Sequence, residues 1–412
     1  MERNTAAPEL RHPWLIVAGS LLGLIVANGP VTLFTYGLLL QPVTQEFGWH
    51  TANFGFAILF AHVSAAATTP FVGHLVDRYG IRRVCLPFIT LFAISFAAIG
   101  LTPASPIVFI LLYTLAGVFS AGQTVMPYAK AVSAAFDMRR GIALGLALAG
   151  VGIGTSLAPN VTHYLIDAYG WRGAYFGLGA LTFALAFPAV AIFVGRADQR
   201  LAAEGERGSA PLLPGVSGRE ARSTFRFWSI AIAGFLVAVA VNGAIPHVVQ
   251  ILTAHGIPRG EAASIQGWAG LAAIAGRIIA GLLLDRIFAT YVALAFFALP
   301  LFGLAMLGMG AEGDLALFAV VTLGLGLGAE IDTMGFMIGR YFGLRRFGEI
   351  YGYSFAMFAL GSGFGPLLWD LTFDATGSYD FAIAASVAAL VVAGLLVLRL
   401  GAYSFPAQPQ HA

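Results

Sequence analysis

The sequence predicts an all-α membrane protein with twelve transmembrane helices in two pseudo-symmetric six-helix bundles. Three observations predict this fold class: the scarcity of charge, the recurrence of apolar runs of about 20 residues, and a repeat between the two halves of the chain. Of the 412 residues, 58% are hydrophobic and 10% are charged, whereas a soluble domain carries about 25% charged residues. A chain with so little charge cannot cover a water-soluble surface, so we expect it to lie in a lipid bilayer.

The apolar runs between polar breaks define the twelve helices. Each run is long enough to cross a hydrocarbon core of about 30 Å. The predicted helices lie near residues 14–41, 51–72, 84–103, 106–134, 141–165, 173–195, 228–253, 262–284, 290–309, 314–339, 350–373 and 381–400. The first run is longer than the apolar core of a typical signal peptide, so it is predicted to be a membrane helix behind a short tail.

The basic residues predict the orientation. All of the 22 basic residues except Lys130, Arg172, Arg259 and Arg277 fall on one side of the predicted membrane. Basic residues are enriched in cytoplasmic segments, so this side, with both termini, is predicted to be cytoplasmic. We expect a monomeric, multi-pass protein of the plasma (inner) membrane.

One long polar segment near the middle of the chain, rich in Gly, Glu, Arg, Ser and Pro, reads as a linker between halves. The predicted organisation is a cytoplasmic tail at 1–13, a six-helix bundle at 14–195, a cytoplasmic linker at 196–226, a second bundle at 227–401 and a tail at 402–412.

The two halves share landmarks at a nearly constant offset. The matched features are Gly73–Arg78 with Gly281–Arg286 and Gly48 with Gly256, both at an offset of 208, and Gly170 with Gly377 at 207. Agreement in register across three landmarks indicates a tandem duplication.

Several motifs resemble those of a transporter family. Gly73 to Arg83, GHLVDRYGIRR, resembles the loop 2–3 signature of the major facilitator superfamily. Four further features resemble its monocarboxylate and oxalate/formate porter group: TYGLLLQPVTQEFGW at 35–49, RRGIALGLALAGVGIG at 139–154, the Gly276-Arg277 pair followed by Gly281, and GAEIDTMGFMIGRYFG at 328–343. This resemblance implies movement of small organic anions, often with protons.

The sequence also departs from that group. Oxalate-type members have a lysine on helix 11, but residues 350–373 contain no lysine or arginine. Animal monocarboxylate carriers have an aspartate four residues before the helix 8 arginine and a lysine on helix 1, whereas Ala273 occupies the first position and helix 1 has no lysine. We therefore expect a different proton relay and a preference for monoanions.

Arg277 is the strongest candidate for binding the anion. It lies deep in its predicted helix, and placing Arg at a helix centre costs about 2.5–3.5 kcal/mol, so it should face a cavity and have a partner. A guanidinium can hold one carboxylate through two parallel hydrogen bonds. The alternative is a structural ion pair with Glu330 or Asp332.

Glu330 and Asp332 are the candidate proton-coupling residues. They lie two residues apart on helix 10 and point to different faces, so one of them is expected to face the cavity. A buried carboxylate near an arginine can gain and lose a proton as substrate binds. A helix cap or a packing hydrogen bond is the alternative role.

Six further polar side chains are candidates for lining a substrate pocket. His247 follows Pro246 and can bond a substrate oxygen or titrate near neutral pH. The other five candidates lie on helices 1, 4 and 11: Tyr36, Gln123, Tyr128, Tyr351 and Tyr353. For all six residues the alternative role is a structural contact between helices.

Charges at the ends of helices 2 and 8 are candidates for gating. Such charges can brace neighbouring helices and separate as the halves rock; the alternative is a solvated loop. The residues are Asp77, Arg78, Arg82, Arg83, Asp285 and Arg286.

Other classes of function are not favoured. The sequence has no nucleotide-binding glycine loop, catalytic triad pattern or nucleic-acid face, and Cys85 is its single cysteine, so we expect no enzymatic activity, cofactor or metal. The leading hypothesis is proton symport of a small monocarboxylate by alternating access. An anion exchanger without net proton coupling and a transporter-like membrane sensor remain alternatives.

Overall fold

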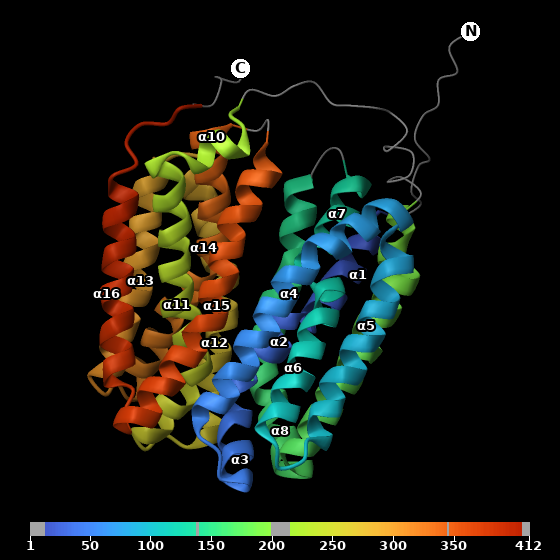
Figure 1. Cartoon of the computed structure of the whole chain (residues 1–412), viewed down its shortest axis with the longest axis vertical. Helices are drawn as coiled ribbons and strands as arrows, with labels where there is room; N and C mark the ends of the chain where they lie inside the picture. Colours follow the sequence, from blue (N-terminus) through green and yellow to red (C-terminus); the bar gives the residue numbers. More distant parts are fainter. Residues whose placement is uncertain (1–12, 137–139, 199–214, 344–345, 406–412) are drawn as a thin grey trace. The chain divides into compact units, whose positions relative to one another are not determined.

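The computed structural model describes residues 13–136, 140–198, 215–343 and 346–405, and within these ranges it contains helices and no β-strand (Figure 1). The helices of the first half are α1 (Trp14–Ile25), α2 (Asn28–Thr32), α3 (Tyr36–Phe47), α4 (Thr51–Tyr79), α5 (Ile81–Ala98), α6 (Pro106–Ser120), α7 (Val125–Ala135) and α8 (Arg140–Pro188). Those of the second half are α10 (Gly218–Arg222), α11 (Phe225–Ala254), α12 (Arg259–Leu284), α13 (Ala289–Gly308), α14 (Gly313–Phe342), α15 (Phe347–Thr376) and α16 (Asp380–Leu398).

The helices have the length and composition of membrane spans. In the described residues, ten segments are long and apolar enough to cross a bilayer. One of them, Ala143–Ala197, has 55 residues and is interrupted at Gly170, so it is long enough for two crossings. α15, with 30 residues, is not among the ten. The predicted fold class of a helical membrane protein is confirmed.

The prediction of one continuous helix at 14–41 is wrong, because this segment is divided into α1, α2 and α3. Ala27 has an extended conformation, with ψ at 165°. Pro30 follows in the first turn of α2, where it lacks an N–H and cannot continue an earlier helix. A second non-helical turn, Leu33–Thr35, separates α2 from α3.

The predicted helix at 106–134 is also divided. A 3₁₀ turn, η2 (Ala121–Gln123), follows α6, and Thr124 is extended with ψ at 170°. Pro127 lies in the first turn of α7, a position that proline tolerates because the first N–H groups of a helix have no intrahelical partner. The break contains Gly122, Gln123 and Thr124, but hydropathy averaged over Pro106–Ser133 stays high, which is why the apolar-run analysis did not reveal it.

The landmark glycines of the repeat all have a positive φ. Gly48, Gly256, Gly170 and Gly377 have φ values of 66°, 87°, 69° and 72°, each at a turn between helices. A side chain is disfavoured at positive φ, so glycine is the natural residue at these positions. The matched positions therefore share the need for glycine, although Gly170 and Gly377 differ in ψ, at 176° and 7°.

The chain forms two compact units. The first comprises Met1–Thr35 and Val63–Ala210, and the second comprises Tyr36–His62 and Pro211–Ala412. In the second unit α11 packs on α15, and α12 packs on α14. The predicted bundle boundaries remain a prediction, and much of the predicted linker and tails, at 1–12, 199–214 and 406–412, lies outside the described residues.

Candidate functional site

Arg277 of α12 and Asp332 of α14 form an ion pair in the second unit. The Arg277 Nε donates to Asp332 Oδ2 at 2.8 Å, and the two side chains are 31% and 38% exposed. Charges with this exposure, on helices of this apolarity, are very costly against lipid, so they are expected to face a water-filled path or another polar surface. Within the described residues, the terminal nitrogens of Arg277 have no hydrogen-bond partner.

Glycines place the two helices of this pair in direct contact. Gly276 of α12 lies against the backbone of Leu325, and Gly328 of α14 lies against the backbone of Ala273. A Cβ on either glycine would overlap a carbonyl oxygen of the opposite helix. Small residues permit such close approach between membrane helices, and here they bring α12 near enough to α14 for Arg277 to reach the carboxylate.

Tyr351 of α15 lies near the ion pair, whereas Tyr353 does not. Tyr351 is within electrostatic range of both Asp332 and Arg277. Tyr353 is 43% exposed, and the Arg222 guanidinium of α10 lies 4.2 Å from the centre of its ring. Since residues two apart on a helix point about 200° apart, only one of these two tyrosines can face the pair.

Glu330 lies two residues before Asp332 on α14 and points to a different face of the helix, in an apolar environment. It is 8% exposed, and Asn242 Nδ2 donates to its Oε1 at 3.3 Å. Its Oε2 has no hydrogen-bond partner within the described residues. The side chain borders a small cavity lined by Ile230, Ala233, Gly234, Val237, Phe297, Thr333, Met334 and Met337. The structure thus separates the two predicted coupling acids.

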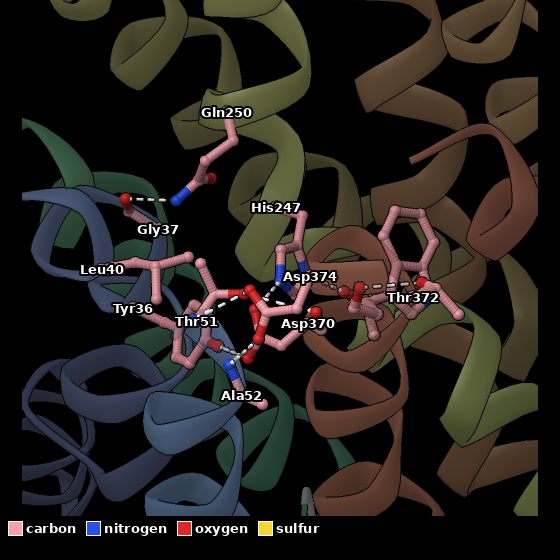
Figure 2. A network of polar contacts seen from close by, with 12 residues as sticks. Tyr36, Gly37, Leu40, Thr51, Ala52, His247, Gln250, Asp370, Thr372 and Asp374 are labelled. Carbon is pink, nitrogen blue, oxygen red and sulfur yellow. Dashed lines mark hydrogen bonds and ion pairs between the residues drawn. The ribbon is translucent and has the colours of Figure 1, made fainter. Parts of the chain in front are cut away.

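A second polar cluster joins His247, Asp370 and Tyr36, all 0% exposed (Figure 2). His247 Nε2 lies 3.0 Å from Asp370 Oδ1, and its Nδ1 lies 2.7 Å from the carbonyl oxygen of Gly243. The Tyr36 hydroxyl donates to Asp370 Oδ2. The cluster therefore connects α11, α15 and α3 within the second unit.

Asp370 is a residue that the sequence interpretation did not select. Aromatic rings surround its partner His247: Trp369 stacks on the imidazole at 5.4 Å between ring centres, and Tyr379 lies 5.3 Å from it. The available signal was a carboxylate within an apolar helix that has no basic residue in 350–373, since a charge in such a position needs a partner on another helix. That partner is His247.

The chain matches a known family along most of its length. Residues 20–366 match the Major Facilitator Superfamily. This chain belongs to the Major Facilitator Superfamily. Its members are membrane transporters, and the chain is accordingly a multi-pass membrane protein and not an enzyme.

Individual members of the superfamily are similar to the chain at low identity. Monocarboxylate transporter 11 of Homo sapiens is 26% identical over 382 residues, which cover 89% of this chain and 77% of that protein. A gallate transporter of Pseudomonas putida is 25% identical over 409 residues, covering 88% and 89%. The crystal structure of the nucleoside transporter NupG superposes with a TM-score of 0.76 at 12% identity, over 94% of this chain and 99% of that one. The superposition shows the shared superfamily fold.

Gln123 and Tyr128 lie in the first unit of this superfamily member. The Tyr128 hydroxyl donates to Gln123 Oε1 at 2.7 Å, and Gln123 Nε2 donates to the Gly23 carbonyl at 2.8 Å. Both side chains are buried, and they tie the break between α6 and α7 to α1. These are helix contacts, and a role in substrate binding stays a prediction.

The predicted gating charges lie at helix ends. Arg78 lies 5.3 Å from the Tyr79 ring centre, the side chain of Asp77 is outside the described residues, and the remaining four are exposed: Arg82, Arg83, Asp285 and Arg286. Asp198, which the sequence did not indicate, accepts from the backbone N–H groups of Ile81 and Arg82 at 2.6 and 3.1 Å. It caps the start of α5. The latch stays a prediction.

Proposed function

We propose that this protein is a secondary active transporter that carries a small organic monocarboxylate together with a proton. The observation that carries the proposal is the half-exposed Arg277–Asp332 pair on two apolar helices. The similarity to a monocarboxylate transporter and to a gallate transporter supports the same class of substrate.

The pair supplies a binding group whose occupancy can change. Arginine has five N–H donors in a planar fork, and Asp332 uses the Nε donor here. The two terminal nitrogens can hold a carboxylate through two parallel hydrogen bonds. Tyr351, which lies near both charges, can add a hydroxyl contact to the same anion. His247, Tyr36, Gln123, Tyr128 and Tyr353 remain further candidates for lining the path.

The same pair couples the anion to a proton. An incoming carboxylate competes with Asp332 for Arg277. When Asp332 takes up a proton, it loses its charge and its hold on the guanidinium weakens. One anion and one proton then enter together, so the net charge of the site does not change in a medium of low dielectric constant. Glu330 is the second candidate for the proton, because its Oε2 has no partner in the described part of the chain.

The absence of a second base sets the preferred charge of the substrate. The sequence of α15 over 350–373 has neither lysine nor arginine, so a second carboxylate on the substrate would be desolvated without an opposite charge. We therefore assign a monoanion. Alternating access, with the helix-end charges as a latch, a plasma (inner) membrane location, cytoplasmic termini and a monomeric state complete the proposal.

The decisive experiment is flux in proteoliposomes. Labelled lactate, pyruvate and an aromatic monocarboxylate are offered with and without an inward proton gradient. We expect gradient-driven accumulation of at least one of them by the unmodified protein and by Arg399→Lys, a control at an exposed position. Counterflow without any response to the gradient would replace symport by exchange, and binding without flux would favour the sensor.

A further inference from the structure

The His247 ring has an oxygen acceptor at each nitrogen. Nδ1 lies 2.7 Å from the Gly243 carbonyl, which can only accept, so Nδ1 must carry a hydrogen. Nε2 lies 3.0 Å from Asp370 Oδ1. With Nδ1 protonated, a neutral ring presents a lone pair at Nε2, and a lone pair facing an ionised carboxylate at this distance is repulsive. The observed contact needs one proton, either on Nε2 or on the carboxyl group.

We propose that His247 and Asp370 share one exchangeable proton, and that this proton holds the segment Tyr36–His62 on α11 and α15. The segment contains α3 and the start of α4, and it belongs to the second unit. Tyr36 donates to the same carboxyl group from α3, so the pair and the segment share one acceptor. Loss of the proton leaves the Nε2 lone pair facing an ionised carboxylate that is 0% exposed, and their repulsion displaces the carboxyl group to which Tyr36 donates.

The other groups around Asp370 do not replace that proton. Tyr36 faces it from α3, Tyr379 lies near it from the connection to α16, and Asp374 lies one turn further along α15. Gly55 is the close neighbour on α4 and has no side chain. Asp374 is the one further charge among these groups, and because its charge is negative it cannot replace the proton.

A different contact holds the start of α4. The Asp374 carboxylate accepts from the backbone N–H groups of Thr51 and Ala52 at 3.1 and 2.8 Å, and from the Thr51 hydroxyl at 2.8 Å (Figure 2). A carboxylate at a helix N-terminus is stabilised while it is ionised. Deprotonation of the His247–Asp370 pair should therefore loosen α3 and leave the start of α4 in place.

The location of the segment explains why its release matters. Both of its ends continue into the first unit, at Thr35 and at Val63, and the turn Leu33–Thr35 is not helical. Any displacement of the first unit must pull on this segment. A proton that holds it in place then controls when it can leave α11 and α15. This inference goes beyond the proposed function, because it does not depend on the anion or on symport.

Hydrogen exchange of the full chain in lipid nanodiscs, without substrate, tests the proposal. Exchange of α3 amides is followed against pH and corrected for the intrinsic rate. A contact that requires one proton predicts about tenfold faster exchange for each pH unit over which that proton is lost. In Asp370→Asn the side-chain amide can donate to Nε2 and its carbonyl can accept from Tyr36, so the rise with pH should disappear. Amides of α13 are the reference.

Two results overturn the proposal: a corrected α3 exchange rate that does not change with pH in the unmodified protein, and an equal pH dependence in Asp370→Asn. Tyr36→Phe is the second variant, to be used if the exchange of the α13 amides shows that Asp370→Asn does not fold. It removes the hydrogen bond that links α3 to the carboxyl group of the pair, so α3 should exchange faster and its corrected rate should no longer rise with pH. A slope equal to that of the unmodified protein in Tyr36→Phe contradicts the proposal that the proton acts on α3 through Tyr36. Since no substrate is present, these outcomes are separate from those of the flux experiment.

Discussion

The second unit contains two pairs of a basic side chain and a carboxylate, Arg277 with Asp332 and His247 with Asp370, and the two pairs differ in solvent exposure. The Arg277 and Asp332 side chains are 31% and 38% exposed, whereas His247 and Asp370 are both 0% exposed. An accessible pair can exchange one partner for a dissolved anion. A sealed pair has room for the gain or loss of a proton and little else. Access, and not charge alone, is therefore the basis on which we propose anion binding at the first contact and proton-dependent packing at the second.

The largest expected effect concerns substrates with two negative charges. Their affinity should distinguish a site with a single arginine from a pocket with several basic residues. Oxalate should bind at least about 100-fold more weakly than a monocarboxylate of similar size, because an unpaired buried carboxylate costs several kcal/mol. Competition of oxalate with labelled monocarboxylate uptake in proteoliposomes measures this ratio. Equal inhibition constants would show that another cation faces the accessible pair.

The next effect concerns the guanidinium itself. Arg277→Lys should insert and fold but lose about 10- to 100-fold of uptake at low substrate, because a point ammonium cannot form two parallel hydrogen bonds and a charged bond contributes about 1.5–3 kcal/mol. Arg399→Lys is the matched control. Near-normal flux in Arg277→Lys would remove the arginine from the anion site.

A packing variant should disturb the accessible pair and spare the sealed one. Gly328→Ala places a Cβ on the backbone of Ala273 and should destabilise the α12–α14 contact by about 1–3 kcal/mol. Faster hydrogen exchange is expected in α12 and α14, with α3 unchanged. Gly281→Ala, which meets no atom within 4 Å, is the control, and equal effects of the two variants would refute the packing argument.

The smallest of the four effects concerns substitution of the two acids of α14. With one coupled proton, each unit of pH gradient should raise substrate accumulation by a factor of about ten. Asp332→Asn and Glu330→Gln are compared in uptake with a gradient and in exchange without one. A variant of the coupling acid loses the gradient response but keeps exchange, because exchange of one loaded site for another need not release the proton. In the unmodified protein, coupling to a proton predicts that net substrate uptake becomes slower as the external pH rises. If both variants accumulate normally, neither α14 acid carries the proton.

The sequence predicted the fold class because apolar length and basic-residue placement are local properties. It also indicated Arg277 and Asp332 as possible partners, since charges in apolar helices need counterions. Apolar length did not reveal the divisions near Pro30 and Thr124, because hydropathy averaged over each segment stays high although Asn28-Gly29-Pro30 and Gly122-Gln123-Thr124 are turn signals. The sequence also could not pair Asp370 with His247 and Tyr36, because residues 123 and 334 positions away are brought together by packing that no single helix specifies.

These separations also set an order in biosynthesis. Arg277 is translated 55 residues before Asp332, which at about 5–20 residues per second leaves α12 for roughly 3–11 s without its counterion. During that interval the apolar remainder of α12 must offset about 2.5–3.5 kcal/mol for the arginine. Tyr36 waits far longer, because Asp370 follows 334 residues later. The sealed contact can therefore form only after residue 370 has left the ribosome, long after α3 has entered the membrane.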